Sequence, residues 1–149
     1  MNLYLLIESS PQCYTAATWT VAAETGDEAR AMVEDWDPRT MSTAVLVEGG
    51  GVGVGAGVLF FTDVRNASDG TAARSLLAEP NGADMGVYLA METSPKCQVA
   101  RLWVVAASTD DEARSSIGTQ WRPDIMSLGY LCKLPLDQTT PTILFQTSN

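Results

Sequence analysis

Arginine and tryptophan lie close together beside a proline at two places in the chain, and this combination is suited to ligand binding. The two segments are Trp36-Asp37-Pro38-Arg39 and Trp121-Arg122-Pro123-Asp124, each preceded by a further arginine, Arg30 or Arg114. A guanidinium group binds phosphate through paired hydrogen bonds, and an indole ring stacks on a nucleobase. The candidate ligand-binding residues are therefore Arg30, Trp36, Arg39, Arg114, Trp121 and Arg122.

The same residues have a simpler, structural interpretation. Each arginine has acidic residues near it in the sequence and would pair with one of them, while Trp36 and Trp121 would cover a hydrophobic core. This interpretation is favoured over ligand binding. The binding hypothesis also leaves open whether the two sets form two related sites or one shared site on an internal twofold axis.

Other catalytic and metal-binding chemistry finds little support in the composition. The chain has no histidine, which excludes Ser-His-Asp and Cys-His systems and histidine-ligated metals. Cys13, Cys97 and Cys132 form no C-x-x-C pair, so they suit neither a disulfide framework nor a zinc site. Asp35-Trp36-Asp37 could contribute to a cation site, but its counterpart Gln120-Trp121-Arg122 lacks both acids. We expect no cofactor, no metal and no enzymatic activity.

A glycine run from Gly49 to Gly57 is the most distinctive local feature. Gly51-x-Gly53-x-x-Ala56 formally matches a phosphate-binding loop, but that motif needs a helix directly after it, and a strand is expected here. A flexible β-hairpin loop is therefore predicted. Whether the run also has a function stays open.

The chain is a tandem duplication. When it is aligned on itself so that Met1 falls on Met85, identical residues coincide along most of its length. After one inserted residue, Trp36 falls on Trp121 and Phe60 on Phe145. We divide the chain into a first repeat (1–63), a linker (64–84) and a second repeat (85–149).

Each repeat has the pattern of two strands, a helix and two more strands. The expected strands cover 4–8, 14–23, 43–48 and 58–62 in the first repeat and their counterparts in the second. Thr25-Gly26-Asp27-Glu28 and Thr109-Asp110-Asp111-Glu112 are capping boxes that begin the helices. The predicted fold is α+β: two tandem pseudo-symmetric ββαββ units, each an antiparallel sheet with one helix on one face.

Charge and hydropathy restrict the partners. Of 149 residues, 18 are acidic and 9 are basic, which gives a net charge of −9 and argues against direct nucleic-acid binding. No apolar run reaches the roughly 20 residues that a membrane helix needs, and no signal peptide is recognisable. We expect no membrane association and a cytoplasmic location.

Each repeat also resembles a group of short phage-encoded ββαββ proteins of largely unassigned function. The matching segments are Tyr4-Leu5-Leu6, Val21-Ala22-Ala23, Glu28-Ala29-Arg30, Trp36 and Gly57-Val58-Leu59. The duplication, the glycine run and the lack of an acidic-aromatic cluster before the second strand depart from that pattern. What a single-copy relative would do as a symmetric homodimer, this chain would do within one polypeptide; homo-oligomerisation of the duplicated chain is left open.

The resemblance implies a counter-defence role in which the protein binds and neutralises a component of host immunity. The expected function is a non-enzymatic sponge that sequesters a nucleotide immune signal. The alternative is an acidic, protein-binding inhibitor of a host defence complex, of the anti-CRISPR or DNA-mimic type. An enzyme and a phage structural or regulatory module rank below these two.

Overall fold

The structure, a computed structural model, describes residues 1–10, 17–34, 36–51, 57–63, 85–93, 100–136 and 140–148. Its elements follow the order ββαββ twice, and all paired strands are antiparallel, which confirms the α+β fold class. The predicted linker, 64–84, lies outside the described residues.

The elements correspond closely between the two repeats. The first repeat contains β1 (Asn2–Glu8), β2 (Ala17–Ala23), α1 (Gly26–Ala31), β3 (Met41–Val47), a 3-10 turn (Gly49–Gly51) and β4 (Gly57–Asp63). The second repeat contains β5 (Met85–Glu92), β6 (Arg101–Ala107), α2 (Asp110–Ile117), a 3-10 turn (Gly118–Gln120), β7 (Met126–Leu134) and β8 (Thr142–Ser148).

The two repeats exchange their fourth strands. Sheet 1 has the order β3-β1-β2-β8, and sheet 2 has the order β4-β6-β5-β7. The last strand of the chain thus completes the sheet of the first repeat, while β4 completes the sheet of the second. We expected all four strands of each repeat to form one sheet. The first three strands of each repeat do so, but the fourth strand pairs in the sheet of the other repeat.

The stacking of the sheets gives a physical reason for the exchange. The edge strand β3 contacts β4 across the sheet interface, and β7 contacts β8. A chain leaving β3 therefore crosses only the gap between sheets, about 10 Å, to reach β4. Reaching the far edge of its own sheet would require passing two strands, about 14 Å in all. The exchange shortens both connections.

This arrangement also corrects the interpretation of the glycine run. Because β3 and β4 lie in different sheets, the run is not a β-hairpin loop but a connection between sheets. At its start, Gly50 donates its N–H to the carbonyl of Met1 (2.7 Å) and accepts from the N–H of Leu136 (2.7 Å). Gly51 has φ +82°, and a Cβ there would lie 2.6 Å from a Leu134 methyl. Glycine is thus required where the two connections meet; residues 52–56 lie outside the described part.

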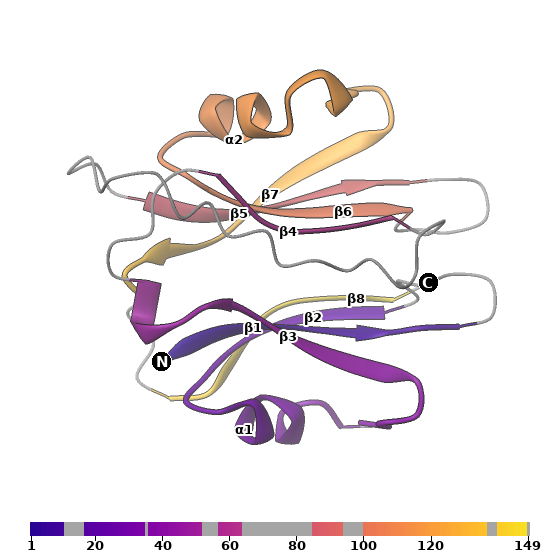
Figure 1. The fold of residues 1–149 in the computed structure, drawn as a ribbon, viewed down its shortest axis with the longest axis vertical. Helices are drawn as coiled ribbons and strands as arrows, with labels where there is room; N and C mark the ends of the chain where they lie inside the picture. Colours follow the sequence, from indigo (N-terminus) through magenta and orange to yellow (C-terminus); the bar gives the residue numbers. More distant parts are fainter. Residues whose placement is uncertain are drawn as a thin grey trace.

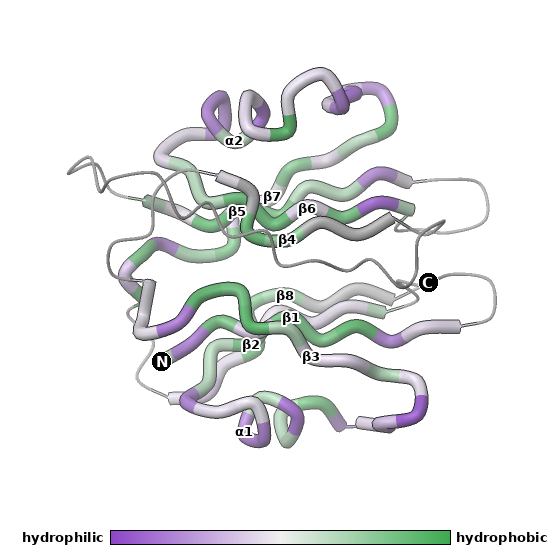
Figure 2. Tube along the Cα trace, in the orientation of Figure 1, coloured by the Kyte–Doolittle hydropathy of each residue, from purple (hydrophilic) through white to green (hydrophobic). Residues whose placement is uncertain are grey.

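The molecule has four layers, with α1 and α2 on the outside and the two sheets between them (Figure 1). The hydrophobic colouring of the tube is concentrated in the sheets, while the helices carry more hydrophilic residues (Figure 2). Three clusters of buried side chains fill the three gaps between layers. The central cluster joins both sheets and includes Leu5, Leu46, Phe60, Val87 and Val104.

Both helices begin with the predicted threonine caps. The hydroxyl oxygens of Thr25 and Thr109 accept from the N–H groups of Glu28 and Glu112, each at 3.1 Å. The carboxylate of each glutamate accepts a hydrogen bond from the N–H of the residue before the cap, Glu24 or Ser108, and not from the N–H of the threonine. On the inner face of each helix, Ala29 and Ala113 are fully buried.

Candidate functional site

In the first repeat, Arg30 and Trp36 lie together beside α1. The guanidinium carbon of Arg30 is 5.7 Å from the centroid of the Trp36 ring, within the range of a cation–π contact. Its Nη2 also donates to Asp27 (2.5 Å), and its Nη1 donates to the Thr43 hydroxyl (3.3 Å). Trp36 packs on the buried cluster beneath α1. The arginine is therefore held by an indole, a carboxylate and a hydroxyl.

The second repeat reproduces this arrangement. The guanidinium carbon of Arg114 lies 5.6 Å from the centroid of the Trp121 ring, and its Nη1 donates to Asp111 at 3.1 Å. Trp121 packs on the cluster beneath α2. These contacts match the structural interpretation of the arginines and tryptophans, because both kinds of residue have a role in packing or ion pairing.

The two arginine–tryptophan clusters do not share one site. Arg30 lies on α1 and Arg114 on α2, and these helices form opposite outer layers with both sheets between them (Figure 1). Any ligand that the clusters bind would therefore occupy two separate places related by the internal symmetry.

The remaining predicted arginines, Arg39 and Arg122, lie in the turns after the tryptophans and have different surroundings. Arg39 pairs with Asp37 through Nε (3.2 Å) and Nη2 (3.1 Å), and the hydrogen bond from this guanidinium lowers the pKa of Asp37. Arg122 is exposed; its N–H donates to the Met126 sulfur (3.1 Å), and its carbonyl accepts from the Met126 N–H (2.9 Å). Asp37 makes the matching contact with Met41.

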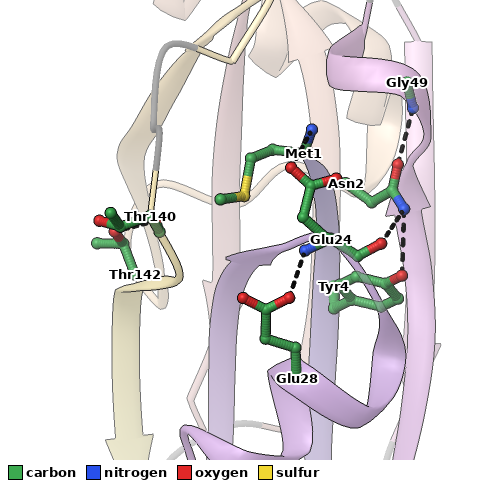
Figure 3. Close-up of polar contacts among 8 residues, drawn as sticks. All are labelled: Met1, Asn2, Tyr4, Glu24, Glu28, Gly49, Thr140 and Thr142. Carbon is green, nitrogen blue, oxygen red and sulfur yellow. Dashed lines mark hydrogen bonds and ion pairs between the residues drawn. The ribbon is translucent and has the colours of Figure 1, made fainter.

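Sequence reasoning missed a polar junction centred on Asn2 (Figure 3). Its amide nitrogen donates to the Tyr4 hydroxyl (3.2 Å) and to the Glu24 carbonyl (3.1 Å), and its carbonyl accepts from the N–H of Gly49 (2.8 Å). Asn2 thereby ties β1 to the start of α1 and to the glycine turn. The residues next to Asn2 in the sequence do not predict these contacts.

A second missed feature is an ion pair at the end of sheet 2. Arg101 donates from Nε (2.6 Å) and from Nη2 to one oxygen of Glu92, and its guanidinium carbon lies 4.9 Å from the Trp103 ring centroid. The two side chains are only 14% and 16% exposed. Glu92 and Arg101 lie directly opposite each other on β5 and β6. Aligning the two predicted strands in this register would have predicted the ion pair.

Among the described residues, no group of three or more Cys, Asp and Glu side chains could hold a metal ion. Cys132 is buried in the central core, whereas Cys13, Cys97 and Asp35 lie outside the described part. Neither described helix has the length and apolar character to span a membrane. Comparisons with protein-family models, with curated proteins and with solved structures give no match.

Proposed function

We propose that this protein is a non-enzymatic phage counter-defence protein that sequesters a nucleotide immune signal at its two arginine–tryptophan clusters. The observation that supports this most is the matching contact of Arg30 with Trp36 and of Arg114 with Trp121, at 5.7 and 5.6 Å. Each cluster combines a guanidinium group for a phosphate with an indole ring for a base.

The aspartates now paired with these arginines would yield to a phosphate. Asp27 and Asp111 are 93% and 97% exposed, and ion pairs at such exposure contribute only about 0–1 kcal/mol. A phosphate offers the guanidinium two oxygens in place of one carboxylate contact. The aspartate then needs only to rotate into solvent, while the indole continues to orient the arginine.

The test is calorimetric titration with cyclic dinucleotides and ADP-ribose derivatives, followed by mass analysis of the nucleotide released on denaturation. We expect two equivalent sites and an unchanged nucleotide. Arg30→Ala should remove one site and Arg114→Ala the other, with a loss of roughly tenfold or more in affinity at the altered site. Lys133→Gln removes one positive charge elsewhere and serves as the control. Absence of heat with every nucleotide would exclude the sponge, and altered nucleotide would indicate an enzyme.

A second candidate is an acidic, protein-binding inhibitor of a host defence complex. It is favoured by the carboxylates that project from the first turns of both helices, since Asp27 and Asp111 are almost fully exposed. A pull-down of a stoichiometric partner from host lysate tests this candidate. Charge reversal at Arg30 and Arg114 should leave such a contact intact but abolish nucleotide binding.

A further inference from the structure

An exposed tyrosine distinguishes the outer face of sheet 2. Tyr130 is 58% exposed and is the large hydrophobic side chain that stands out into solvent among the described residues. Its ring meets that of Tyr88 edge to face, with centroids 5.4 Å apart and an interplanar angle of 71°. A Cβ at Gly86 would lie 2.6 Å from Tyr130 Cε2, so the glycine lets this ring lie on the sheet. The ring is therefore presented in a defined orientation.

Carboxylates flank this tyrosine pair. Asp110 accepts a hydrogen bond from Tyr88, and burial, together with the charge of Asp110, raises the pKa of the Tyr88 phenol. Asp110 and its neighbour Asp111 are exposed at the start of α2. We call Tyr88, Tyr130 and Asp110 the Tyr130 surface. It joins an aromatic ring to a negative charge, the combination that recognises an organic cation.

The fold does not require this surface, because the first repeat builds the same elements without it. The positions of Tyr130, Gly86 and Asp110 are taken there by Val45, Asn2 and Gly26. There Asn2 donates a hydrogen bond to the Tyr4 hydroxyl (Figure 3). An exposed aromatic residue that packing does not demand is typical of a binding surface.

We propose that the Tyr130 surface binds an arginine side chain within a basic segment of a partner protein. The guanidinium would stack on the Tyr130 ring, with Asp110 as its counter-charge. The net charge of −9 would attract a basic partner over a distance. Because β7 is at an edge of sheet 2, its outer backbone groups can receive an extended polypeptide, which a free cation would not use.

This inference is separate from nucleotide binding, and it rests on the protein-binding candidate, to which it gives a defined surface. One residue of β7 opposes the binding of a basic segment, because Lys133 is positively charged and exposed on that strand. Replacing this lysine by glutamine should therefore tighten binding of a basic segment.

The experiment uses a fluorescently labelled peptide of alternating arginine and glycine, with binding followed by anisotropy at fixed ionic strength. Tyr130→Ala should weaken binding by about 2- to 30-fold, the range of a cation–π contact. Asp110→Asn should weaken it measurably, whereas Glu34→Gln, which removes the same charge from an exposed side chain after α1, should change it by less than about twofold. Circular dichroism confirms that each variant folds.

The outcomes separate the two levels of the proposal. Equal weakening by Asp110→Asn and Glu34→Gln, or no effect of Tyr130→Ala, would overturn the Tyr130 surface and leave general acidic binding in place. Arginine amide binding as tightly as the peptide would overturn a polypeptide site in favour of a small-cation site. No binding of the peptide to the unaltered protein would exclude this surface, whereas the protein-binding candidate is decided by the pull-down.

Discussion

Sheet 1 and sheet 2 have the same architecture but different side chains at many equivalent positions. Each sheet has two shifts in strand register, and they fall at equivalent points. One lies between β1 and β3 in sheet 1 and between β5 and β7 in sheet 2. The other lies where the exchanged strand pairs, between β2 and β8 and between β6 and β4. In contrast, the ion pair of Glu92 with Arg101 has only Glu8 and Ala17 as its counterpart. The shared features belong to the fold, and the unshared ones are open to a role that only one repeat performs.

The largest expected effect comes from removing β8. A chain that ends before Thr142 should lose protection in β2, because β8 pairs with β2 although the two lie in different repeats. Three partly buried apolar residues, Ile143, Leu144 and Phe145, leave the fold with it, so we expect a loss of several kcal/mol in unfolding free energy. Amide hydrogen exchange, read strand by strand, provides the measurement.

A matched pair of core variants controls for general destabilisation. Phe145→Ala should speed exchange first in β2, and Phe60→Ala first in β6, as their strand partners dictate. The opposite pattern, with Phe145→Ala acting on β6, would show that the repeats keep their own fourth strands.

The ion pair at the end of sheet 2 should produce the next largest effect. Arg101→Ala leaves Glu92 as a poorly solvated, unpaired charge, which typically costs about 3 kcal/mol. Urea denaturation measures the change. Glu92→Gln added to Arg101→Ala should recover part of the loss, since it removes that charge. A loss under about 1 kcal/mol would mean that solvent screens the pair as it does at the surface.

A smaller gain is expected from two threonines that face the central core of sheet 1. Thr18 and Thr20 are 1% and 0% exposed, and their hydroxyls have no hydrogen-bond partner in the described structure. Sheet 2 has Leu102 and Val104 at these positions. Thr20→Val should stabilise the protein by about 1 kcal/mol, because it removes an uncompensated buried hydroxyl.

The reverse substitution sharpens this comparison. Val104→Thr should destabilise by about 1–3 kcal/mol if the core around sheet 2 also lacks a partner for the hydroxyl. Thermal unfolding of both variants is the readout. A destabilising Thr20→Val would show that its hydroxyl is satisfied in solution, for example by a buried water.

The two turns after the tryptophans should differ slightly in their response to pH. Asp37 has a pKa below that of a free aspartate because Arg39 hydrogen-bonds its carboxylate. Its contribution to stability is therefore present above the pKa of the unfolded aspartate and is lost as pH falls through the lower, folded value. Carboxyl NMR titration should place the Asp37 midpoint low, and Arg39→Ala should raise it. An unchanged midpoint would contradict this.

The sequence predicted local structure well. The threonine caps and the order of the strands were both predicted, because each depends on neighbours within a few residues. The exchange of strands was not visible. β4 and β8 carry the same Leu-Phe motif, so either can fill either place, and only the stacking of the sheets decides between them.

The site residues show the same limit. Pairing of Arg30 with Asp27 and of Arg114 with Asp111 follows from helical spacing and could be expected. Asn2 and Tyr130 could not, because their roles depend on contacts with Gly49 and Gly86, which strand pairing and chain crossing bring close. Nucleotide binding and counter-defence stay predictions.

The exchanged strands also determine how the molecule would respond to mechanical force. β1 and β8 are the first and last strands, yet both pair with β2 in sheet 1 and run in the same direction. Handles attached at Asn2 and Ser148 would pull on opposite ends of this sheet, in line with its strands (Figure 1). The interstrand hydrogen bonds of sheet 1 would then bear the force together, in shear. Sheet 2 would bear little force until sheet 1 had ruptured.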